Sequence, residues 1–148
     1  MAGGRFQGSA LVDRPIDEVF AFLADGTNDK LFSPRVLEIA KTTDGPVGVG
    51  TVFASTVKDG GFKSKREFEI TEFTPTNTIR WTEKSSNMVF VPQGGYDLVV
   101  EGMSTRVTLW NELQGKGFGK LIVGMALSQA RKSADDMAAA IKKAIESS

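Results

Sequence analysis

Few side chains in this sequence are suited to acid–base or metal chemistry. The 148 residues include no histidine and no cysteine. Without histidine the chain lacks the usual general base near neutral pH and the commonest metal ligand, and without cysteine it has neither a thiolate nor a disulfide. No metal site and no cofactor is therefore expected. An enzyme would need another acid or base, and Glu83 is the best candidate if burial raises its pKa.

Two pairs of polar residues are predicted to lie on one face of a sheet. Arg66 and Glu83 would be diagonal neighbours on adjacent strands, where a facing ion pair could orient a polar group of a ligand. An ordinary ion pair at the open end of the sheet is the alternative. Tyr96 and Asn111 could hold a ligand carbonyl or hydroxyl, or could simply bond each other or water.

A glycine-rich segment, Gly115–Lys120, joins a predicted strand to a predicted helix and so invites a phosphate-loop interpretation. The pattern fails, because Gln114 stands where a Walker loop needs its first glycine and Leu121 replaces the Ser or Thr. We interpret the segment as a flexible hinge into the helix.

The first of two predicted hairpins positions Arg66 and Glu83. It joins Phe62–Thr74 to Asn77–Lys84 around Pro75-Thr76. Apolar residues meet on one face when Thr74 is paired with Asn77, and a buried face is what fixes the register of a sheet. This register sets Ile70 opposite Trp81 and Phe68 opposite Glu83.

The second predicted hairpin positions Tyr96 and Asn111. It joins Gly95–Glu101 to Arg106–Glu112 around Gly102–Thr105. Pairing Glu101 with Arg106 gives the apolar matches on one face. The predicted pairs are Val100 with Val107, Leu98 with Leu109, and Tyr96 with Asn111. Trp110 falls on the other face of its strand, with nothing in the sequence to cover it.

The remaining chain supplies three further strands and three helices. The strands are expected over Arg5–Asp13, Val36–Thr42 and Thr51–Lys58. Pro15 favours a helix start, and Asp25–Asn28 ends that helix. A short second helix is expected over Asp29–Phe32. Apolar residues at alternating four- and three-residue spacing predict a long helix from Phe118 to Glu146.

The two halves of the long helix differ. The second half has a narrow apolar stripe, whereas the first is apolar nearly all round and carries small residues, so it needs apolar surface on more than one side. A sheet curled around it could leave a ligand cavity. Tight packing without a void and an exposed dimer patch are the alternatives. The apolar lining would comprise Phe68, Ile70, Trp81, Tyr96, Leu98, Leu109, Phe118, Ile122 and Met125.

Four motifs follow one another along the chain: VDRPIDEVFAFLAD at Val12–Asp25, LFSP at Leu31–Pro34, VGVGTVF at Val47–Phe53 and ITEFTPTNTIRW at Ile70–Trp81. In this order they resemble the START-like (SRPBCC) superfamily, and within it the bacterial polyketide cyclase/dehydrase and lipid-transport-like proteins. The resemblance implies an α+β helix-grip fold. In this fold a curved seven-stranded antiparallel sheet grips the C-terminal helix, with two short helices after the first strand. It also implies an internal cavity for lipids, polyketides or similar molecules.

The favoured hypothesis is a single START-like domain, residues 1–148, that binds or carries an apolar small molecule. A polyketide cyclase or aromatase-like enzyme using the same cavity, assisted by Glu83, Arg66 or Tyr96, is the first alternative. A protein-interaction module with a collapsed cavity is the second. Lys plus Arg and Asp plus Glu both number 18, so the totals suggest no nucleic-acid partner. No signal peptide or membrane span is recognisable, which predicts a cytoplasmic monomer or homodimer without stable membrane insertion.

Overall fold

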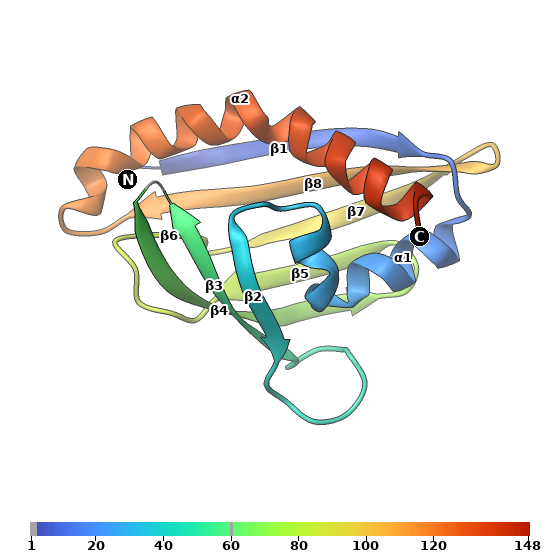
Figure 1. The fold of residues 1–148 in the computed structure, drawn as a ribbon, viewed down its shortest axis with the longest axis horizontal. Helices are drawn as coiled ribbons and strands as arrows, with labels where there is room; N and C mark the ends of the chain where they lie inside the picture. Colours follow the sequence, from blue (N-terminus) through green and yellow to red (C-terminus); the bar gives the residue numbers. More distant parts are fainter. Residues whose placement is uncertain (1–2, 60) are drawn as a thin grey trace.

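The computed structural model describes residues 3–59 and 61–148. One long antiparallel sheet wraps around the chain's helices (Figure 1). The elements in chain order are β1 (Gly3–Val12), α1 (Ile16–Ala24), the 3-10 helix η1 (Gly26–Leu31), β2 (Val36–Lys41), β3 (Val52–Asp59), β4 (Phe62–Thr74), β5 (Thr78–Glu83), β6 (Val89–Phe90), β7 (Gly94–Glu101), β8 (Ser104–Gly115) and α2 (Gly119–Glu146).

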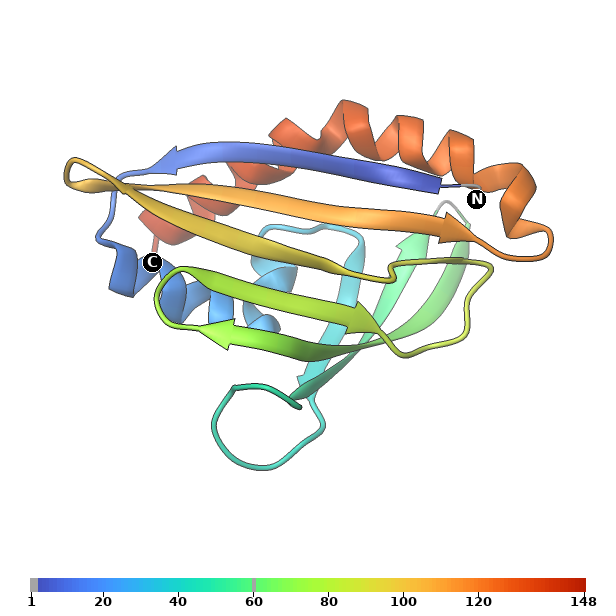
Figure 2. The same ribbon diagram turned by 180° about the vertical axis from the view of Figure 1, so that it is seen from behind.

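The sheet has the strand order β1-β8-β7-β5-β4-β3-β2, and β6 pairs with β8. The expected α+β architecture is confirmed, with eight strands rather than seven. The additional strand is β6, whose two residues are too few to show the alternation that identifies a strand. Figure 2 shows the curvature of the sheet from its outer side.

The short helix after α1 begins earlier than expected, at Gly26 instead of Asp29. Asp25 supplies the reason, because its carboxylate accepts a hydrogen bond from the Thr27 backbone N–H at 3.0 Å. A carboxylate in this position satisfies a free donor at the start of a helix. Residues 25–28, interpreted as a turn, therefore hold the cap and the first turn of η1.

The register of the first hairpin is confirmed where it matters for the site. Ile70 lies opposite Trp81, and Phe68 lies opposite Glu83. Nearer the turn the expected register is wrong, since Thr74 pairs with Thr78 and not with Asn77. An irregularity between Ile70 and Glu72 absorbs one residue, which is the effect of a β-bulge.

The register of the second hairpin is wrong by two residues. Glu101 pairs with Ser104, so the turn is the two residues Gly102 and Met103, and Gly102 adopts the positive φ of 64° that such a turn requires. As a result Leu98 lies opposite Val107, and Tyr96 lies opposite Leu109. A shift of two keeps every side chain on its predicted face, because side chains alternate with a period of two.

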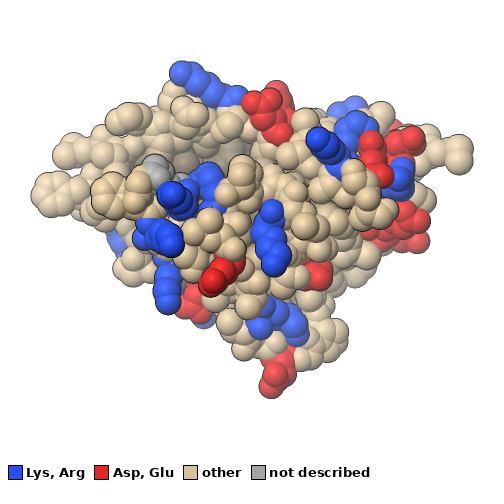
Figure 3. Space-filling view, viewed as in Figure 1, with Lys and Arg blue, Asp and Glu red and all other residues tan. Residues whose placement is uncertain are grey.

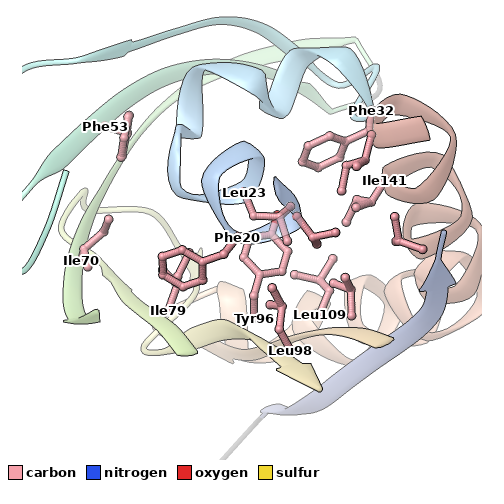
Figure 4. Close-up of a cluster of buried hydrophobic side chains, with 14 residues drawn as sticks. Phe20, Leu23, Phe32, Phe53, Ile70, Ile79, Tyr96, Leu98, Leu109 and Ile141 are labelled. Atoms are coloured by element: carbon pink, nitrogen blue, oxygen red, sulfur yellow. The ribbon is translucent and has the colours of Figure 1, made fainter. Parts of the chain in front are cut away.

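Helix α2 lies along β1 and β8 (Figure 1). The Gly8 backbone of β1 approaches it so closely that a Cβ there would lie 2.3 Å from the carbonyl oxygen of Ala134. The helix presents Val123, Leu127, Ala134, Ala138, Ile141 and Ile145 to the interior. At the C-terminal end of α2 the interior is a dense apolar cluster, in which Phe20, Leu23 and Phe32 pack between the sheet and Ile141 (Figure 4).

Candidate functional site

The inner face of β3, β4 and β5 is covered unevenly. Helices α1 and η1 cover one end of the sheet, whereas α2 packs on β1 and β8 and leaves the other end of these strands more open. Phe68 and Trp81 are half-buried there, while Ile70, Leu98 and Leu109 are buried. Figure 3 shows this side of the molecule hollowed between α2 and the strands below it. We call this region, floored by Phe68, Trp81 and Asn111, the inner trough.

Arg66 and Glu83 form the expected ion pair, with Arg66 Nη1 3.0 Å from Glu83 Oε1. The Glu83 side chain is fully buried, with 0% exposure. It also accepts hydrogen bonds from Ser85 Oγ at 2.6 Å, Asn87 Nδ2 at 2.8 Å and the Val91 backbone N–H at 2.9 Å. Its two oxygens are therefore saturated with donors. This carboxylate holds the segment between β5 and β6 in place and is poorly suited to proton transfer.

Arg66 has hydrogen-bond donors that remain free, whereas both carboxylate oxygens of Glu83 are already occupied. All of its hydrogen bonds to described residues use Nη1, which contacts both Glu83 oxygens and, at 3.1 Å, the Val89 carbonyl oxygen. Nε and Nη2 have no partner among the described residues. The side chain is 18% exposed and belongs to the same strand face as Phe68. Arg66 can therefore offer N–H donors to a bound molecule without breaking its ion pair.

Asn111 meets Trp81 instead of Tyr96. Trp81 Nε1 donates to Asn111 Oδ1 at 2.9 Å, and the Trp81 ring touches the Tyr96 ring edge-on, with centroids 5.1 Å apart. The two side chains meet directly above Gly94, where a Cβ would lie 2.0 Å from Asn111 Oδ1. The two-residue change of register explains the new partner, because it places Asn111 opposite Gly94. The Asn111 amide nitrogen and the Tyr96 hydroxyl have no hydrogen-bond partner among the described residues.

Asp29 is a half-buried carboxyl group that the sequence did not single out as an acid or base. Burial, and secondarily the charge of Asp25, raise the pKa of Asp29 from 3.8 to about 7. Its charge also contributes to raising the pKa of the Tyr96 hydroxyl, for which burial is the larger cause. The two groups therefore interact electrostatically, Asp29 from η1 and Tyr96 from β7. No sequence pattern indicates this interaction. In the sequence Asp29 belongs to a polar segment, and it comes to face Tyr96 electrostatically only when η1 packs on the sheet.

The three residues of the predicted lining that lie in α2 or just before it take different positions. Phe118 is 76% exposed and Met125 is 74% exposed. Met125 lies on the opposite side of the helix from the buried Val123 and Leu127. Ile122 is 44% exposed and lies on the flank of α2 that also carries the core-packed Met137. The other flank faces the outer edge of β1, where Arg131 Nε donates to the Arg5 carbonyl oxygen at 3.1 Å. Ile122 therefore stands at the rim of the inner trough.

Two hollows on the described residues are lined by residues other than Phe68, Trp81 and Asn111. One, of about 310 Å³, is lined by residues 3–5 and 112–114. The other, of about 330 Å³, crosses β2, β3 and β4 and includes Arg66. Arg66 is the only residue of the predicted site that lines either one.

The whole-chain comparison decides the family. Residues 4–146 match the family described as polyketide cyclase / dehydrase and lipid transport. The chain belongs to this family. The START-like resemblance inferred from the four motifs is thereby confirmed. None of the curated proteins compared with the chain is a match in sequence.

Solved structures give the same fold at low sequence identity. A protein from Thermus thermophilus superposes with a TM-score of 0.80 at 16% identity, covering 97% of each chain. The Zhui aromatase/cyclase from a Streptomyces species has a TM-score of 0.76 at 16% identity, covering 97% of this chain and 94% of its own. Norcoclaurine synthase from Thalictrum has a TM-score of 0.72 at 16% identity, covering 98% of this chain and 95% of its own. At these identities the similarity establishes the helix-grip fold of this polyketide cyclase / dehydrase family member and nothing about its substrate.

Proposed function

We propose that the protein binds an apolar small molecule carrying one or more polar groups in the inner trough. The observation that carries this proposal is a set of unpartnered polar groups on a half-buried apolar face. The set comprises the Asn111 amide nitrogen, the Tyr96 hydroxyl and the Nε and Nη2 atoms of Arg66. Buried polar groups are normally hydrogen-bonded. A face on which several polar groups lack a partner therefore suits a ligand that forms hydrogen bonds with them.

A fourth group supports the same proposal. The Ser64 hydroxyl oxygen is buried and has no hydrogen-bond partner among the described residues. Ser64 belongs to the same face of β4 as Arg66 and Phe68, two and four residues further on. The polar groups thus run from Ser64, near the β3–β4 turn, along the inner face to Tyr96, which lies beyond the trough floor at the end that the helices cover. An elongated ligand with polar groups at more than one position matches this arrangement, and the family's description is compatible with lipids and polyketides.

The two tryptophans allow a direct test. Trp81 lies on the inner face, whereas Trp110 is buried on the outer face beneath the guanidinium groups of Arg5 and Arg80, at 4.2 Å and 5.1 Å from its ring. Titration of Trp110→Phe with fatty acids or aromatic polyketides should change the emission of the remaining Trp81. Trp81→Phe, in which only Trp110 emits, should respond at most weakly. Equal responses from both variants would place binding outside the trough.

A cyclase activity in the same trough is a second candidate, and Asp29 is the observation that favours it. A general acid or base works best when its pKa lies near the working pH, and the Asp29 pKa of about 7 meets that condition. Asp29 replaces Glu83 in this role, because the Glu83 carboxylate is saturated with donors. Tyr96 would then hold a carbonyl oxygen of the reacting chain.

The cyclase candidate is tested with Asp29→Asn and a poly-β-ketone substrate. If Asp29 acts as a base, cyclisation should rise with pH to a plateau above about 7, and the variant should lose roughly a hundredfold or more in rate while still binding substrate. Glu83→Gln tests the earlier assignment in parallel, with its folding checked by circular dichroism. An unchanged rate in Asp29→Asn would leave the protein as a binder.

A further inference from the structure

Large apolar side chains stand exposed around the start of α2. Leu121 is 81% exposed, Met125 is 74% exposed and Phe118 is 76% exposed. Leu121 and Met125 are one helical turn apart on the side of α2 that faces away from the sheet. They do not line the inner trough, so ligand binding there does not account for their exposure.

Two neighbouring segments extend this apolar surface. The Met88 carbonyl oxygen accepts a hydrogen bond from the Lys116 backbone N–H at 2.8 Å, so Met88, which is exposed, lies beside the start of α2. Asn87 Nδ2 reaches the Lys65 carbonyl oxygen at 3.4 Å and ties the same segment to β4. Phe62, at the start of β4, is 82% exposed. We call the exposed Phe62, Met88, Phe118, Leu121 and Met125 the apolar end.

The same three segments are strongly basic. Residues 58–65, 84–88 and 116–125 contain six lysines and one aspartate, a formal charge of +5 in a chain whose net charge is zero. Lys84 pairs with Glu69 at 3.1 Å. Lys58, Lys63 and Lys120 are exposed and have no carboxylate partner among the described residues. Figure 3 shows Lys and Arg gathered over β3 and β4, below α2.

We infer that the apolar end docks on an anionic lipid membrane, with Leu121, Met125 and Phe62 entering the interface and the lysines contacting lipid headgroups. Exposed apolar side chains ringed by lysines are the composition of an interfacial binding surface. The charge argues against a second copy of the chain as the occupant, since two such ends would repel each other. Among the described residues no helix is long and apolar enough to cross a membrane, so the contact is peripheral.

The inference is tested by co-sedimentation of the full chain with vesicles. Phosphatidylcholine vesicles are compared with vesicles containing about a third phosphatidylserine, at about 0.1 M salt, where screening is moderate. Binding is expected to the anionic vesicles and to fall as salt is raised.

Leu121→Ser with Met125→Ser should weaken vesicle binding by roughly tenfold or more, because apolar burial in the interface is lost. Lys58→Gln, Lys63→Gln and Lys120→Gln together should weaken it on the order of a hundredfold, at about fivefold for each lysine.

Matched controls lie outside the apolar end. Met103 is 92% exposed in the β7–β8 turn, and Lys143 is exposed in the last turn of α2. Met103→Ser and Lys143→Gln should each change vesicle binding less than about twofold. Absence of binding, equal binding to neutral and anionic vesicles, or equal losses in test and control variants would overturn the inference. So would a dimer in sedimentation equilibrium that Leu121→Ser dissociates. Because the readout is vesicle-bound protein, it can fail while trough binding, read by Trp81 fluorescence, succeeds.

Discussion

At the scale of single residues, Asp29 couples the interior of the protein to pH. Its pKa of about 7 in the folded protein lies above the 3.8 of an unperturbed aspartate. Between these two values the unfolded chain holds fewer protons at this site than the folded chain does. The Asp29 contribution to stability is therefore fully present below about pH 4 and is lost as the pH rises to about 7.

We expect the free energy of unfolding to fall across this window by about 2–4 kcal/mol from Asp29, since each pKa unit corresponds to about 1.4 kcal/mol and the residue is half-buried. Denaturant titrations of the wild type and Asp29→Asn at several pH values measure the difference between them, which should grow in favour of the variant as the pH rises. Asp44→Asn, at an exposed position, is the control. A constant difference between wild type and Asp29→Asn from pH 4 to pH 8 would show that this carboxyl is not shifted.

The bond between Trp81 and Asn111 gives a second residue-scale prediction. Asn111→Leu removes the acceptor of a half-buried indole N–H, and an unsatisfied buried donor costs about 1–3 kcal/mol. Urea unfolding should show a loss in this range, with a shift in Trp81 emission in the folded state. Asn111→Asp, which keeps an acceptor, should lose less. Equal losses would mean that the hydrogen bond contributes little.

At the scale of elements, the packing of α2 on β1 depends on glycine at one position and not at another. A Cβ on Gly8 would lie 2.3 Å from the Ala134 carbonyl oxygen, whereas a Cβ on Gly124 would meet nothing within 4 Å. Gly8→Ala should therefore force the helix away from the strand and destabilise the protein by roughly 1–3 kcal/mol. Gly124→Ala should stabilise it by about 0.5–1 kcal/mol, because alanine is the better helix former. Thermal unfolding of both variants tests the pair, and a loss in Gly124→Ala as large as that in Gly8→Ala would refute it.

The elements themselves were largely predictable, and the failures have local causes. Alternation in Phe62–Thr74 and the helical spacing after Phe118 are long, repeated signals that one residue cannot disturb. The bulge between Ile70 and Glu72 and the turn at Gly102 and Met103 each depend on only one or two residues. Neither produces a repeated pattern in the sequence. A hydrophobic pattern is compatible with registers two residues apart, because both bury the same face. Pairing Tyr96 with Asn111 was wrong for that reason.

At the scale of the whole molecule, the sequence predicted the fold and could not assemble the site. The four START-like motifs run along the chain in an order that only the complete fold explains. The electrostatic interaction of Asp29 with Tyr96 depends instead on how η1 packs on the sheet, which no local sequence pattern indicates. The charge totals did not reveal the lysines around the apolar end, because acidic residues elsewhere bring the net charge of the chain to zero.

Native mass spectrometry of the freshly purified protein tests the central claim, that the inner trough binds an apolar ligand, most directly. We predict a discrete additional mass that is lost on denaturation, or that appears after incubation with a fatty acid or an aromatic polyketide. Ile122→Trp, which places a large side chain at the trough rim, should lower the occupied fraction severalfold, while Met103→Ser at the distant β7–β8 turn should leave it unchanged. A bare mass under all these conditions, together with an unresponsive Trp81, would contradict the claim.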